Sequence, residues 1–173
     1  YSETPCKAAA VYTQNKVKGA PIAVTKAHLA QGDIRAVIVN SGNANTCNID
    51  GEYKAEQMCA MAAQCLNINT HEVAVASTGV IGEVLPIEPI RDAVPALVKG
   101  LSREGSKEAS RAIMTTDTVK KEYAVQVTIG GETVTIGGMA KGSGMIHPNM
   151  ATMLCFLTTA GDKRYVQHGF GGR

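Results

Sequence analysis

Apolar residues recur along the chain in short runs, and the spacing within each run predicts a strand or a helix. Residues 34–40 (IRAVIVN) form a continuous β-branched run, which is typical of a buried strand. Residues 72–76 (EVAVA) predict a second strand that leads into a turn-rich loop at residues 77–82. Between these strands, residues 52–66 carry apolar side chains at helical spacing. The strand–helix–strand order favours a layered α/β architecture.

The first part of the chain predicts two short strands. Residues 8–13 (AAAVYT) and 21–25 (PIAVT) are apolar, and they flank a turn-prone segment at residues 15–19. We therefore expect both to be extended.

After the second long strand the pattern returns to helical spacing. Residues 86–101 repeat apolar side chains at helical intervals, and Pro95 should kink or divide the helix that they predict. Residues 106–114 predict a short helix with Ser106 as its N-cap. The polar loop MTTDT at residues 114–118 follows.

A β-hairpin is predicted next. Residues 123–129 alternate, Gly130 and Gly131 form a two-residue turn, and the chain returns over residues 133–136. The hairpin leads into residues 138–156 (GMAKGSGMIHPNMATMLCF), which places this Gly-rich stretch at a strand end and in the loop beyond it.

Composition restricts the classes of function. The 173 residues, 45% hydrophobic and 18% charged, suit one globular domain. The net charge of +2 and the absence of Trp argue against a nucleic-acid partner, so we expect a small polar ligand. No apolar run approaches the roughly 20 residues that span a bilayer, so no membrane partner is expected.

The cysteines and histidines predict neither disulfides nor a metal site. Five Cys lack C-x-x-C spacing and four His are widely separated, so reduced thiols and a cytoplasmic location are expected. The chain begins at Tyr1 without Met, so a segment that targets the protein to an organelle remains an alternative.

Three loops combine hydroxyl groups with backbone amides or an ammonium group: residues 77–79, 114–118 and 141–152. Each loop alone is ordinary turn chemistry. Lys141 precedes its glycines, whereas a phosphate-binding loop places Lys after them. A Schiff-base lysine for pyridoxal phosphate would need an acidic partner at recognisable spacing, and none is present.

Cleavage of the chain just before Thr152 would make this threonine a possible catalytic nucleophile. A terminal threonine carries a nucleophilic hydroxyl and a basic α-amine on one residue, and that amine has a pKa near 7.7–8.0. Ala151 is small and leaves its carbonyl open to attack. A threonine in such a segment is otherwise most often a buried strand residue.

A series of motifs decides between these readings. From residue 1 to about 159 the chain resembles the ornithine acetyltransferase family of arginine biosynthesis, also called bifunctional glutamate N-acetyltransferase/amino-acid acetyltransferase. The motifs that carry the resemblance are, in the family's order, VNSGNAN, VASTGVIG, AIMTTDT, IGGMAKGSGMI and PNMATML. Their number and order make the resemblance far more specific than any one of them.

The resemblance implies an α/β fold, a layered mixed-sheet sandwich of the self-processing N-terminal-nucleophile type. It implies self-cleavage between Ala151 and Thr152 into an α and a β chain. Thr152 would then take the acetyl group of N-acetylornithine and pass it to glutamate through an acetyl-threonine ester.

The same resemblance assigns four further residues. Thr78 and Gly79 match the family's oxyanion-hole pair, whose donors face the developing negative oxygen. Thr115 and Lys141 match its substrate-binding positions, and an ammonium suits an α-carboxylate. No metal or cofactor is implied.

The implied partners are N-acetylornithine, glutamate and a β chain of the same precursor in an α2β2 heterotetramer. Members that also use acetyl-CoA share these motifs, so acetyl-CoA stays open as a second donor. Residues 1–159 form a single domain that covers the α chain and the start of the β chain, and residues 160–173 form an unrecognised tail. The alternatives are an incompetent fragment that binds a β chain only, and a related self-cleaving aminopeptidase.

Overall fold

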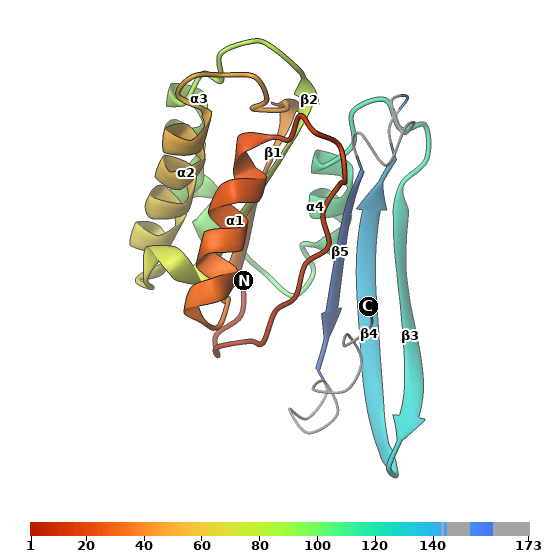
Figure 1. The fold of residues 1–173 in the computed structure, drawn as a ribbon. Coiled ribbons are helices and arrows are strands. Elements are labelled where there is room, and N and C mark those ends of the chain that lie inside the picture. Colours follow the sequence, from red (N-terminus) through yellow and green to blue (C-terminus); the bar gives the residue numbers. More distant parts are fainter. Residues whose placement is uncertain (143, 145–152, 161–173) are drawn as a thin grey trace.

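The computed structural model describes residues 1–142, 144 and 153–160. One part of the fold is a parallel pair of strands with helices packed against it, and the other is an antiparallel sheet of three strands (Figure 1). The elements of the first part are α1 (Ala20–Gln31), β1 (Ala36–Asn43), α2 (Gly51–Leu66), the 3-10 helix η1 (Thr70–Glu72), β2 (Val73–Val80) and α3 (Glu88–Lys99). The remaining elements are α4 (Ser106–Ala112), β3 (Lys121–Ile129), β4 (Glu132–Lys141) and β5 (Leu154–Thr159).

The core lies between the parallel pair and its helices. β1 and β2 run in parallel from Ala36 opposite Val73 to Asn43 opposite Val80. Their inward side chains pack against α1, α2 and α3, and Met58 and Val73 are fully buried there. The buried cluster consists of Val24, Ala36, Ile38, Ala55, Met58, Cys59, Ala62, Ala63, Val73, Val75, Leu85 and Val94.

Helix α1 lies along the outer edge of β2. The Thr25 hydroxyl donates to the carbonyl oxygen of Val75 at 2.7 Å and accepts from the Val75 N–H at 2.9 Å. His28 Nδ1 lies 2.7 Å from the carbonyl oxygen of Val73. Side chains of α1 thus satisfy backbone groups of β2 that a further strand would otherwise bond.

Both strands predicted near the N-terminus are wrong. Residues 8–13 are irregular, because no described strand pairs with them and side chains such as Val11, 86% exposed, face solvent. Residues 21–25 belong to helix α1. Pro21 occupies the first helical turn, where an N–H is not needed, and burial recurs at helical spacing at Pro21, Val24, Thr25 and His28.

The other predicted elements of the first part and the short helix α4 are confirmed, with two corrections. Pro95 does not divide α3, which runs unbroken as a helix of 12 residues with Val94 buried against the core. Ser106 is not an N-cap, because the cap position of α4 falls on Gly105 and Ser106 is the first helical residue.

The predicted hairpin is confirmed and is longer than the alternation indicated. β3 and β4 pair from Ile129 opposite Glu132 to Lys121 opposite Ala140. Gly130 and Gly131 have φ values of 61° and 89°, the left-handed conformation that a tight hairpin turn requires. β5 adds to the other side of β4, so that Lys141 at the end of β4 pairs with Leu154.

One face of the antiparallel sheet is apolar and exposed. Alternation along β3 places Tyr123, Val125, Val127 and Ile129 on the same face, and each is at least 38% exposed. Leu157 of β5 lies on this face opposite Gly138 and is 68% exposed. Val134 of β4, opposite Val127 on this face, is only 7% exposed, so the exposed apolar surface consists of its neighbours on β3 and of Leu157.

Helix α4 connects the two parts (Figure 1). The Ser41 hydroxyl of β1 donates to the carbonyl oxygen of Ile113 at 3.1 Å, just after α4. The Ser110 hydroxyl of α4 donates to the Glu122 carboxylate of β3 at 3.0 Å. Glu122 also accepts from Lys120 at 2.6 Å. These contacts hold the loop after α4 between the two sheets.

Candidate functional site

Three side chains from distant parts of the chain meet where the two sheets approach each other. The Lys141 Nζ atom at the end of β4 donates to the Thr78 hydroxyl of β2 at 3.0 Å. It also donates to the Thr115 hydroxyl, in the loop after α4, at 2.6 Å. The sequence predicted these residues as parts of three separate loops, and the structure brings them into direct contact.

Lys141 is an unusual residue for such deep burial. Its exposure is 1%, and Thr78 is fully buried beside it. Burial disfavours the charged ammonium and lowers the pKa of Lys141 below its ordinary value. The nearby Asp117 carboxylate opposes this shift, and the Lys121 ammonium adds to it.

The hydrogen bonds of Lys141 determine what the two hydroxyls can do. An ammonium has three donors and accepts nothing, so both threonine oxygens act as acceptors toward it. Each hydroxyl therefore keeps its own hydrogen for another acceptor. In this arrangement the Thr78 hydroxyl is able to donate to an oxygen that gains negative charge.

Gly79 is a position where only glycine fits. Its φ is 130°, and a Cβ atom there would lie 2.2 Å from the carbonyl carbon and oxygen of Gly42 on β1. The predicted loop at residues 77–79 is wrong in one respect, because these residues continue β2 and pair with β1. The β1 backbone passes so closely that Thr78 and Gly79 are fixed by the parallel pairing itself.

The strand geometry also gives a direction for the Gly79 N–H. Backbone groups of successive residues in a parallel strand face alternately toward and away from the neighbouring strand. Val73 and Val75 face away from β1, because they bond to side chains of α1. Gly79 shares their alternation, so its N–H is expected at the outer edge of β2 and not in the β1 ladder.

Asp117 is a site residue that the sequence reasoning missed. Its carboxylate is 2% exposed, and one oxygen accepts from the Lys121 ammonium at 2.6 Å and from the Gly142 N–H at 2.9 Å. The bond from Lys121 is the main cause of a lowered pKa of Asp117, and the Gly142 N–H adds to it. Its only signal in the sequence is that it stands two residues after Thr115, within the MTTDT loop.

The asparagines of the SGNAN segment are structural. The Asn43 side-chain oxygen accepts from the Asn45 N–H at 2.8 Å, which forms an Asx turn at the end of β1. Asn45 is fully buried with a φ of 49°, and its amide donates to the Gly51 carbonyl at 2.8 Å. This loop therefore connects β1 to the start of α2.

The predicted cleavage pair, Ala151 and Thr152, lies outside the described residues. The described part of the chain contains the other four residues that the resemblance assigned to the site: Thr78, Gly79, Thr115 and Lys141.

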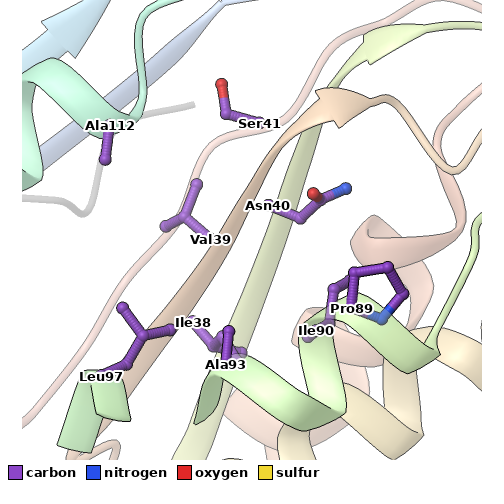
Figure 2. A pocket seen from close by; sticks show the side chains of 9 residues that line it. All are labelled: Ile38, Val39, Asn40, Ser41, Pro89, Ile90, Ala93, Leu97 and Ala112. Carbon is purple, nitrogen blue, oxygen red and sulfur yellow. The ribbon is translucent and has the colours of Figure 1, made fainter.

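A groove of about 210 Å³ lies on another side of β1, next to α3 (Figure 2). It is lined by Ile38, Val39, Asn40, Ser41, Pro89, Ile90, Ala93, Leu97 and Ala112. This lining contains no titratable side chain, so acid–base chemistry has no donor there. Thr78, Thr115 and Lys141 do not line this groove, although its residue Ser41 pairs with Thr78 along the parallel strands.

The described part of the chain has neither a cluster of metal ligands nor a helix that could span a membrane. In the described ranges, no three His, Cys, Asp or Glu side chains gather closely enough to hold a metal ion. No described helix combines the length and the apolar character needed to cross a membrane. The cytoplasmic location stays a prediction.

Comparison with known proteins identifies similar sequences over nearly the whole chain. The model of the ArgJ family matches residues 1–165 and thus reaches into the segment that was left unrecognised from residue 160. The arginine biosynthesis bifunctional protein ArgJ of Symbiobacterium thermophilum is 52% identical over 159 residues, which is 91% of this chain. The chain spans 40% of the length of that relative.

Two solved structures share the fold. The crystal structure of arginine biosynthesis bifunctional protein ArgJ from Bacillus halodurans superposes with a TM-score of 0.78 at 48% identity, over 86% of this chain and 79% of that chain. The ornithine acetyltransferase of Mycobacterium tuberculosis complexed with ornithine gives a TM-score of 0.72 at 35% identity, over 88% and 80% of the two chains. The mixed α/β fold predicted from the resemblance is confirmed.

Proposed function

Because this chain belongs to the ArgJ family, we propose that it carries the nucleophile and the anion-binding groups of an acetyltransferase in arginine biosynthesis. The reaction would move the acetyl group of N-acetylornithine to glutamate. One observation carries the proposal. The buried Lys141 ammonium joins Thr78 and Thr115, the residues that the family motifs assign to oxyanion stabilisation and substrate binding.

The proposed nucleophile forms by self-cleavage between Ala151 and Thr152. The Thr152 hydroxyl attacks the Ala151 carbonyl carbon, and the peptide nitrogen leaves as the α-amine of Thr152. The resulting ester is then hydrolysed by water, which releases the carboxylate of Ala151 and the free hydroxyl of Thr152. The product has a nucleophile and a base on one residue.

Acetyl transfer then proceeds in two half-reactions. The Thr152 oxygen attacks the acetyl carbonyl of N-acetylornithine, its proton passes to the α-amine, and that amine protonates the leaving nitrogen of ornithine. Glutamate enters next, and its neutral amine attacks the acetyl ester. The ester C–O bond breaks, and the proton returns to the Thr152 oxygen, which restores the free enzyme.

Thr78 and Gly79 would stabilise the oxyanion in each half. The Thr78 hydroxyl accepts from Lys141, so its own hydrogen is free to donate. The Gly79 N–H is expected on the outer edge of β2. One such donor is typically worth about 3–4 kcal/mol in the transition state.

Lys141 and Thr115 would hold the substrate. The third donor of the Lys141 ammonium suits the α-carboxylate that N-acetylornithine and glutamate share. Thr115 is exposed, so its hydroxyl is within reach of a ligand while it contacts Lys141. A carboxylate beside Lys141 would also favour the charged form of this buried amine.

The proposal includes a partner. The chain spans 40% of the length of the curated relative quoted above, and Tyr123, Val125 and Leu157 on one face of the antiparallel sheet are 42–78% exposed. We propose that a β chain from the same precursor packs there and that two such pairs form an α2β2 assembly. Large exposed apolar faces commonly mark such contacts.

Intact-mass spectrometry tests the proposal directly. The purified chain is expected to be cut between Ala151 and Thr152, and incubation with N-acetylornithine should add one acetyl group to the fragment that begins with Thr152. The matched controls are Thr152→Ala, which should remain whole, and Thr152→Ser, which should still be cut.

Two results would contradict the proposal. A whole wild-type chain without an adduct would favour the incompetent fragment. An acetyl adduct that is lost to water as rapidly as to glutamate would favour hydrolysis, as in the aminopeptidase alternative.

A further inference from the structure

The loop that carries Thr115 is attached to the end of β4 by a buried carboxylate. Asp117 Oδ1 accepts from the Gly142 N–H at 2.9 Å, and Gly142 directly follows Lys141. The same oxygen accepts from Lys121 Nζ at 2.6 Å, at the start of β3. One carboxylate therefore connects the loop to the neighbouring ends of two strands.

This attachment lies next to the contact between Thr115 and Lys141. Among the described residues, two hydrogen bonds join the loop to the end of β4: Asp117 to Gly142, and Lys141 to Thr115. The bond between Asp117 and Gly142 joins the residue just after Lys141 to the residue two positions after Thr115. Without it, the bond to the exposed Thr115 hydroxyl alone would join the loop to the end of β4 among the described residues, while Ser41 of β1 would still bond to the carbonyl oxygen of Met114.

The charge of Asp117 acts at the same place. The groups that face the Lys141 ammonium are the Thr78 and Thr115 hydroxyls, the Asp117 carboxylate and the Lys121 ammonium. Asp117 supplies the negative charge in this set. It also binds Lys121, and so partly neutralises the cation that repels Lys141.

We propose that Asp117 is a positioning residue that holds the Lys141 ammonium and the Thr115 hydroxyl in place through its bonds to Gly142 and Lys121. Its negative charge, in addition, favours the charged form of Lys141. The effect of Asp117 on the chemistry rests on the proposed acetyl-transfer function.

Two variants separate the geometric role of Asp117 from its charge. Asp117→Asn keeps an oxygen that can accept from the Gly142 N–H but removes the negative charge. Asp117→Ala removes both. The matched control is Glu122→Gln, because Glu122 is also a carboxylate bonded to a lysine at 2.6 Å, but its other partners, Ser110 and Ser106, belong to α4 and not to the site.

The first readout does not need enzymatic activity. NMR of the chain labelled with nitrogen-15 at lysine Nζ follows the protonation of Lys141 against pH, with Lys141→Met to assign its signal. Asp117→Asn is expected to move the Lys141 titration to lower pH. Asp117→Ala should also shift the backbone amide signals of Thr115 and Gly142, and Glu122→Gln should leave both readouts unchanged.

An unchanged Lys141 titration in Asp117→Asn and Asp117→Ala would overturn the inference. So would a shift of the same size in Glu122→Gln, because the effect would then not be specific to Asp117.

The second readout is the rate of self-cleavage, measured by intact mass across pH. We expect Asp117→Asn to slow cleavage about tenfold at neutral pH, which corresponds to 1.36 kcal/mol in the barrier. Cleavage relative to wild type should recover as the pH falls and Lys141 regains its proton, whereas a general loss of structure would give no such recovery. If the wild-type chain stays whole, the proposed function fails, and the NMR comparison decides the role of Asp117 by itself.

Discussion

Substitution of Gly79 tests whether the close approach of β1 and β2 fixes the site. In Gly79→Ala the new Cβ would lie 2.2 Å from two backbone atoms of Gly42 and 2.6 Å from the Asn43 nitrogen. Ordinary contacts begin at 3.4 Å, and backbone atoms cannot turn aside as a side chain does. Overpacking of this kind costs about 1–3 kcal/mol, in addition to about 1–3 kcal/mol for a non-glycine residue in this conformation.

Gly42 provides a matched control on the facing strand. It pairs with Gly79 and has a φ of 138°, close to the 130° of Gly79, but a Cβ there meets nothing within 4 Å. The conformational cost is therefore similar in both variants, and the difference between them measures the clash. We expect Gly79→Ala to be less stable than Gly42→Ala by about 1–3 kcal/mol.

Urea unfolding followed by circular dichroism measures this difference. With a slope of about 2 kcal/mol per molar urea, the midpoint of Gly79→Ala should fall about 1 M below that of Gly42→Ala. Equal midpoints would refute the reasoning, because the β1 backbone would then yield to the added methyl group at no cost.

Three further predictions concern buried groups. Burial lowers the pKa of Lys141, so between the folded and the unfolded pKa the unfolded chain binds more protons than the folded chain. The free energy of unfolding should therefore rise with pH until the ordinary lysine pKa near 10.4. Urea unfolding at alkaline pH measures this rise, and Lys141→Met should remove it. Thr25→Val leaves the N–H and C=O of Val75 without their partner and should cost about 2–4 kcal/mol in urea unfolding, whereas Thr25→Ser should retain most of the stability. Burial raises the pKa of Cys59 to about 12, so iodoacetamide should label Cys59 only after unfolding. Labelling of Cys59 in the native chain at the rate of the exposed cysteines would contradict this prediction. The cysteines expected to react in the native chain are Cys6, Cys47, Cys65 and Cys155.

The sequence predicted the long elements well because each carries its own periodic pattern. The run IRAVIVN was recognised by its β-branched residues, the helix at residues 52–66 by its helical spacing, and the hairpin by its alternation and its Gly130–Gly131 turn. Residues 21–25 were misread because their β-branched side chains favour a strand, whereas Pro21 suits the first turn of the helix that actually forms. Burial at Val24 and His28 follows helical spacing, but this pattern appears only when the window is extended beyond Thr25.

The site was predicted in its members but not in its arrangement. The family motifs identified Thr78, Thr115 and Lys141, and the sequence alone contains nothing that brings residues 63 positions apart to 3.0 Å. That contact depends on α4 and its loop, which bring the two sheets together. Asp117 was missed for the same reason, because its partner Gly142 lies 25 positions away and is met only in the folded chain.

The docking of α1 on β2 also protects the molecule from self-association. An open strand edge presents unpaired N–H and C=O groups that recruit strands from other molecules, and natural proteins block such edges. Here Thr25 and His28 occupy backbone groups of Val75 and Val73 that an intruding strand would need. Variants that detach α1 should therefore aggregate through this edge, even where the core beneath the helix remains intact.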